Sequence, residues 1–148
     1  MNYHGEFPKI IKLAADIGNS TITMQPISEF TITLSVGDYA IEFIPLYNVS
    51  ATNVGTGWNL QNGTAVLSNY SFMSVLSSTA TAAYHNFYTS RNQDFATVQT
   101  SRTLDNRGVI RFNFTVTTAG TVIPHFRSEA AGALVTLRAG SYIIINKV

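Results

Sequence analysis

The chain has 148 residues, a net charge of +1 and no cysteine. A single domain with its own core is therefore expected, and disulfides, thiolate chemistry and cysteine-based zinc sites are excluded. Only 11% of the residues are charged, against about 25% in an average soluble protein. A surface covered by Ser, Thr, Asn and apolar groups favours association with further copies or with a larger assembly over a free monomer. The small net charge gives no long-range attraction to nucleic acid or to an anionic membrane, and neither a secretion signal nor a continuous membrane span is visible.

The first eighteen residues are predicted to form a short N-terminal arm (1–18) ahead of one domain (19–148). The arm combines several apolar side chains with two lysines. Because each buried apolar side chain contributes about 1.5–3 kcal/mol, several of them could anchor a docked arm. The residues predicted to attach the protein to a larger assembly are Phe7, Pro8, Lys9, Ile10, Ile11, Lys12 and Leu13. The alternative is that this segment is simply the first strand of the domain.

Alternating apolar and polar residues predict two half-buried strands farther along the chain. Phe30, Ile32, Leu34 and Val36 alternate with Thr and Ser, and residues 110–117 repeat the pattern with larger side chains. A strict period of two is the signature of a strand with one face on the core. The chain is therefore expected to be all-β.

Two other stretches, 39–47 and 142–145, are apolar on both faces. In an antiparallel sandwich one face of a strand usually meets water, so such strands indicate either a second buried surface between subunits or a covering loop. The residues predicted to contribute to an oligomer interface are Tyr39, Phe43, Tyr142 and Ile144.

Turns containing Gly, Asn or Asp recur between the expected strands, which is typical of an antiparallel β-sandwich or jelly roll. Two stretches interrupt this regularity. Residues 77–83 are rich in Ser, Thr and Ala, and 84–107 are polar with scattered aromatics. These are predicted to be long loops with short strands, and with one helical turn near 80–87.

No catalytic constellation is visible in the sequence. The three histidines are isolated, the eight acidic residues are dispersed, and nucleophile-elbow and phosphate-loop motifs are absent. The chain is therefore expected to be no enzyme and to need no cofactor or metal. No dense basic run suggests nucleic-acid binding.

Carbohydrate binding is an alternative that the aromatic residues keep open. An exposed Trp58, or the cluster of Tyr84, Phe87 and Tyr88, could stack on sugar rings. The interpretation that Trp58 packs beneath a loop is favoured.

Two stretches resemble a group of phage structural proteins. Leu34 to Tyr47 is similar to the "Leu, small, small, Gly, Thr/Asp, Tyr, x, apolar, Glu" opening of that group, and Gly120–Phe126 with Leu134–Tyr142 is similar to its C-terminal pattern. The resemblance covers residues 27–148. It implies an antiparallel jelly-roll β-sandwich akin to tumour-necrosis-factor and complement heads, and it implies a homotrimer.

The resemblance also implies a function: a non-enzymatic virion protein, made in the host cytoplasm and placed on the phage head. Its partner would then be the major capsid protein, which it would decorate and cement from outside. A tail-fibre or tail-spike tip that binds a host-surface glycan is the alternative, and a secreted lectin-like module is a third. Because only a short segment precedes the domain, without heptads or repeats, capsid decoration is favoured.

Overall fold

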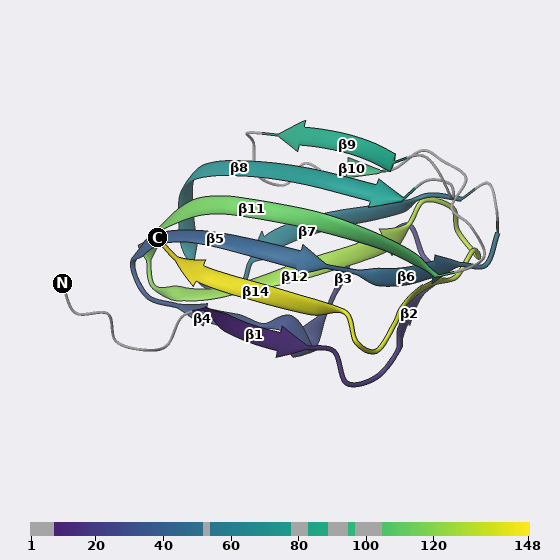
Figure 1. Cartoon of the computed structure of the whole chain (residues 1–148), viewed down its shortest axis with the longest axis horizontal. Helices are drawn as coiled ribbons and strands as arrows, with labels where there is room; N and C mark the ends of the chain where they lie inside the picture. Colours follow the sequence, from purple (N-terminus) through teal and green to yellow (C-terminus); the bar gives the residue numbers. More distant parts are fainter. Residues whose placement is uncertain (1–7, 52–53, 78–82, 89–94, 97–104) are drawn as a thin grey trace.

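The computed structural model describes residues 8–51, 54–77, 83–88, 95–96 and 105–148. Within these residues, strands form two antiparallel sheets that pack face to face, with one short 3-10 helix, η1 (Ser28–Phe30), between β3 and β4 (Figure 1). The strands are β1 (Lys9–Lys12), β2 (Ile17–Asn19), β3 (Gln25–Pro26), β4 (Ile32–Leu34), β5 (Gly37–Ile44), β6 (Leu46–Val49), β7 (Thr56–Asn62), β8 (Val66–Ser77), β9 (Ala83–Tyr88), β10 (Phe95–Ala96), β11 (Asn106–Thr118), β12 (Gly120–Ser128), β13 (Val135–Leu137) and β14 (Tyr142–Lys147).

The large sheet is six strands wide. At three of these six places, two short strands follow each other end to end. β5 and β6 continue each other across Pro45 and both pair with β11. On their other side lie β14 and β13, which pair in turn with β1 and β2. Beyond β11, the strands β8 and β9 complete the sheet. The order is therefore β1/β2, β14/β13, β5/β6, β11, β8, β9.

The small sheet has the order β10, β7, β12, and β4 and β3 follow each other end to end along the free edge of β12. From β4 onward the chain crosses repeatedly between the sheets: β5 and β6 lie in the large sheet, β7 in the small one, β8 and β9 in the large one, β10 in the small one, and so on to β14. This alternation is jelly-roll topology, and it confirms the predicted all-β antiparallel jelly-roll sandwich.

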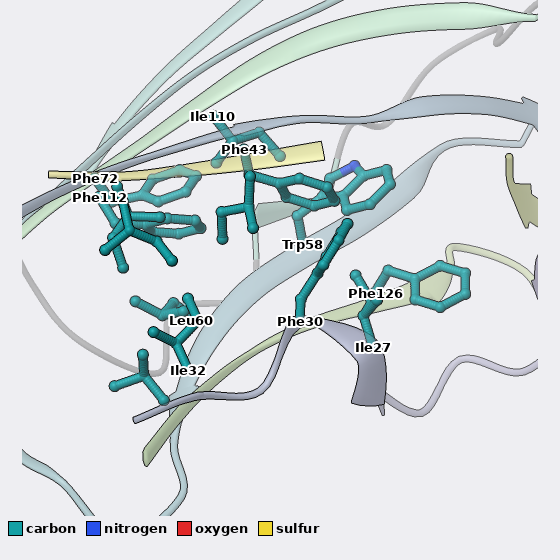
Figure 2. Packing of buried hydrophobic residues seen from close by; sticks show 14 of the residues in the cluster. Ile27, Phe30, Ile32, Phe43, Trp58, Leu60, Phe72, Ile110, Phe112 and Phe126 are labelled. Carbon is teal, nitrogen blue, oxygen red and sulfur yellow. The ribbon is translucent and has the colours of Figure 1, made fainter. Parts of the chain in front are cut away.

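The core between the sheets is built around Trp58 of β7 (Figure 2). Its indole contacts Phe43 and Tyr47 edge to face, at centroid distances of 5.6 and 5.3 Å, and stacks on Phe126 at 6.0 Å. The buried indole Nε1 donates a hydrogen bond to the Thr56 hydroxyl at 2.7 Å. Trp58 is 1% exposed and cannot stack on a sugar; it packs between the two sheets, whereas the favoured interpretation placed it beneath a loop.

The predicted alternation agrees well with the structure, with three corrections. Ile110, Phe112, Phe114 and Val116 all point into the core. Between residues 30 and 36 the regular strand covers only Ile32–Leu34, so the face predicted to include Val36 ends before it, and Val36 is 59% exposed.

The second and third corrections concern residues 77–107. Ala83–Tyr88 form strand β9 paired with β8, where a helical turn was predicted, and β11 already begins at Asn106. The backbone of β9 completes the edge of the sheet, which a polar sequence pattern does not reveal. Among the described residues, no helix has the length and apolar character needed to span a membrane.

Candidate interaction surfaces

The outer face of the large sheet carries several exposed or half-exposed apolar side chains. In β14, Tyr142 and Ile144 alternate with the buried Ile143 and Ile145, so they point away from the core. Cross-strand pairing aligns one row across all six strands of this face. In order the row reads Ile10, Ile144, Glu42, Arg111, Met73 and Phe87. We refer to this surface as the outer face.

Two apolar patches lie at opposite borders of the outer face. The first, on β1 and β14, consists of Ile10, Tyr142 and Ile144, with Ile10 64% exposed. The second, on β8 and β9, consists of Met73, Val75 and Phe87, with Phe87 67% exposed. Single exposed apolar side chains need no explanation, but clusters that continue across paired strands indicate an interaction surface.

An ion pair separates the two patches. The Arg111 Nε donates to the Glu42 Oε2 at 2.6 Å, between adjacent residues of β11 and β5. Because both side chains are partly exposed, the pair contributes little to the stability of an isolated subunit. Covered by a partner it would gain strength and fix the register of the contact.

The structure divides the four predicted interface residues into two pairs. Tyr142 and Ile144 lie on the outer face, half-buried. Tyr39 and Phe43 lie on the inward face of β5, where each is 1% exposed, so the prediction that they contact another subunit is wrong. In β5 they alternate with Asp38 and Glu42, and a strand places successive side chains on opposite faces. Because Asp38 and Glu42 face the solvent, Tyr39 and Phe43 face the core.

The predicted N-terminal arm is largely part of the sandwich. Lys9–Lys12 form β1, which pairs along its whole length with β14. Ile11 packs against the core, and Leu13 is 2% exposed within it. The domain thus includes Lys9–Lys12 and Leu13, ahead of the predicted boundary at residue 19, and the open alternative, a first strand, is correct for this stretch because Ile11 and Leu13 supply core surface. Pro8 is exposed ahead of β1, while Phe7 lies outside the described residues.

Polar contacts fix the connection from β1 to β2. The Arg138 guanidinium donates to Asp16 at 2.8 Å and to Asp105 at 3.1 Å. The backbone N–H of Ala139 donates to the second oxygen of Asp16 at 2.8 Å. The Ala139 N–H and then Arg138 hold the pKa of the Asp16 carboxyl below its usual range, and the two carboxylates raise the pKa of Arg138. This cluster joins the β1–β2 link, the β13–β14 link and the start of β11.

Catalytic groupings are sparse in the part of the chain that the structure describes. No three His, Asp or Glu side chains there stand close enough to hold a metal ion. His125 faces its own strand, with Nδ1 2.9 Å from the carbonyl oxygen of Ile123. Tyr47 is buried beside Trp58, and burial raises the pKa of its phenol.

Comparison with known proteins adds one similarity of fold. No protein-family model matches the sequence, and no curated protein matches it. A solved structure of Eiger TNF from S. frugiperda aligns over 95% of this chain and 93% of its own, with a TM-score of 0.45 and 11% sequence identity. The similarity concerns the course of the chain; the jelly-roll assignment rests on the strand order described above.

Proposed function

We propose that this protein is a non-enzymatic structural module that assembles as a homotrimer and decorates the outside of a phage head, with the major capsid protein as its partner. The observation that carries the proposal is the outer face of the large sheet, which is apolar at both borders. A monomer that remained alone would leave Ile10, Met73 and Phe87 in water.

The size of the outer face suits a subunit contact. Six strands that lie about 4.8 Å apart span roughly 24 Å, and about eight residues at about 3.4 Å each span roughly 27 Å. The flat area of the outer face is therefore about 650 Å², without the additional surface of protruding side chains. A specific interface buries about 800 Å² on each partner. If two neighbours share the outer face, each contact receives about half of this area, and residues around the borders must supply the rest.

The arrangement of the patches favours a closed ring over a two-fold dimer. The patch on β1 and β14 and the patch on β8 and β9 differ in shape and composition, and they lie at opposite borders of one face. If the first patch of one subunit packs on the second patch of the next, the contact is heterologous, and it gives a ring where the rotation between subunits closes and an open filament where it does not. A ring of three is the smallest such assembly, and it agrees with the trimer that the sequence resemblance implies.

The position on a phage head rests on the sequence resemblance at Leu34 to Tyr47, Gly120–Phe126 and Leu134–Tyr142. The first stretch contains β5, the second most of β12, and the third β13 and the first residue of β14. Of the outer face, these stretches include Glu42 and Tyr142, while the other apolar residues of its two borders lie outside them. The resemblance and the outer face therefore support the proposal as separate observations.

Light scattering at micromolar concentration tests the assembly. The wild-type protein should have about three times the chain mass of 16.1 kDa, and Ile144→Asp should reduce the mass towards that of the monomer because it places a charge in the contact. Ile22→Asp is the matched control, since Ile22 is an exposed isoleucine in the link between β2 and β3, away from the strands of the outer face, and it should leave the mass unchanged. A wild-type monomer would sink the proposal.

Electron microscopy of purified particles tests the location. Antibody labelling should decorate heads at many regularly spaced positions. Labelling confined to tails would replace capsid decoration by the tail-fibre or tail-spike alternative.

A further inference from the structure

The centre of the outer face carries a charged pair that uses little of its hydrogen-bonding capacity. Glu42 of β5 and Arg111 of β11 are cross-strand neighbours, and the Arg111 Nε donates to the Glu42 Oε2 at 2.6 Å. Among the described residues this is the single side-chain hydrogen bond of either group. A guanidinium also donates through both Nη atoms, and a carboxylate accepts through both oxygens. The Nη groups of Arg111 and the Oε1 of Glu42 are therefore available to a second partner.

Apolar side chains surround this pair. In the same row, Ile144 of β14 lies beside Glu42, and Met73 of β8 lies beside Arg111. The adjacent row of the outer face is apolar over four strands, and it consists of Tyr142, Ile44, Val109 and Val75. A partner that covers these two rows gains apolar contact, and it must also compensate the charges of the pair.

The order of the strands decides where the pair lies in a ring of three. If the patch on β1 and β14 of one copy meets the patch on β8 and β9 of the next, the three outer faces turn inward like the walls of a prism. The middle strands of each wall, β5 and β11 (Figure 1), then lie nearest the three-fold axis. Walls about 24 Å wide place this axis about 7 Å from each sheet. Side chains between packed sheets fill about 5 Å on each side, so long side chains such as those of Glu42 and Arg111 are needed to reach the axis.

The charges of three copies alternate in sign around this axis. In each copy β5 is on the side of the preceding copy and β11 is on the side of the following copy, because β14 precedes β5 and β8 follows β11 across the sheet. Arg111 of one copy therefore lies toward Glu42 of the next. Every charge then has opposite charges as its neighbours, which is the arrangement that burial of ionised groups requires.

We propose that Glu42 and Arg111 of three copies form a closed ring of ion pairs on the three-fold axis, in which each guanidinium bonds its own carboxylate and that of the next copy. This rests on the proposed trimer, and it adds the groups that determine how the copies match. An exposed ion pair contributes little to stability, whereas breaking a buried one leaves a charge without its partner. Assembly should therefore depend on the two side chains jointly.

A double-mutant cycle on assembly tests the ring. Sedimentation gives the protein concentration at which half of the chains are assembled, for the wild type, Arg111→Met, Glu42→Leu and the variant with both substitutions. Each single variant should need about a hundredfold higher concentration, because three like charges remain on the axis, and the double variant should assemble within about threefold of the wild type. The matched control is Lys9→Met, which removes one positive charge on the side of β1 opposite to Ile10. It should assemble as the wild type does.

An exchanged pair separates the contact from folding of the subunit. Glu42→Arg combined with Arg111→Glu keeps both charges and their alternation around the ring, so it should assemble as the wild type does, while each of its two substitutions alone should not. Circular dichroism checks that every variant is folded.

The remaining outcomes decide against the ring. Single variants that assemble as well as the wild type would overturn it and leave the trimer in place. Folded double and exchanged variants that both fail to assemble would show that the two side chains do not act as a pair between copies. A single variant that unfolds would assign the pair to the subunit itself. A wild-type monomer or dimer would remove the proposed trimer.

Discussion

Replacing Phe43 by alanine tests whether this residue stabilises the core of the subunit or a contact between subunits. Phe43 is 1% exposed and packs edge to face against Phe30 at 5.5 Å and against Trp58 at 5.6 Å. Removal of a buried phenylalanine side chain costs about 3–5 kcal/mol, and each aromatic pair adds about 0.5–1.5 kcal/mol beyond the burial of area. We expect a loss near the upper end of that range, a large fraction of a typical stability of about 5–15 kcal/mol.

Urea unfolding measures this loss, with wild type and variant at equal protomer concentration because association contributes to apparent stability. The matched control is Ile144→Ala, which removes a side chain of the outer face. It should weaken association with a much smaller effect on the unfolding of the isolated subunit. If Phe43→Ala lowers the unfolding free energy by less than about 1 kcal/mol yet dissociates the oligomer, the placement of Phe43 in the core is wrong.

Two further perturbations address the N-terminal segment and its polar anchor. Leu13→Ala should cost about 2–5 kcal/mol in urea unfolding because Leu13 is buried, whereas Lys12→Ala, at the exposed residue beside it in β1, should leave the midpoint nearly unchanged; equal effects would contradict the placement of Leu13 in the core. Asp16→Asn should destabilise the protein at neutral pH, and the difference from wild type should disappear on acidification. The sign follows from the pKa of Asp16, which folding lowers: the ionised carboxylate contributes stability above the usual Asp range near 4, and this is lost as the pH falls through the lower folded value. A difference that persists at pH 2 would exclude the carboxylate as its source.

The sequence predicts the fold class well because the alternation of polar and apolar residues in a half-buried strand shows both that the segment is a strand and which of its faces lies on the core. Residues 110–117 show this clearly, since every second side chain is polar. Strand β14 does not, because Tyr142 to Ile145 are all apolar and only Asn146 marks the solvent side. In β5 the signal was present: Asp38 and Glu42 share one parity, which places Tyr39 and Phe43 on the opposite face. The apolar residues on both faces of β5 led to the prediction of an interface on this strand, but the residues chosen for it, Tyr39 and Phe43, are those that face the core.

The N-terminal segment shows a different limit. Ile10 and Ile11 are adjacent, so the segment has no clear period, and a short edge strand resembles a free arm in sequence. Its placement depends on β14, more than 130 residues away in the chain. Pairing over such a separation is a tertiary property that local pattern does not encode. The outer face has the same origin, since its central row combines residues from six strands.

Assembly through the outer face has a consequence for attachment to a larger partner, because a trimer presents each attachment surface three times. Once one subunit is bound, the second and third contacts become intramolecular, and the combined affinity can exceed that of one contact by about 10²–10⁴. Ile144→Asp should therefore lower head binding by a factor of this size at equal protomer concentration, provided that the subunit remains folded by circular dichroism. If the monomeric variant binds heads as tightly as the wild type, a single subunit suffices for attachment, and assembly through the outer face serves some other purpose.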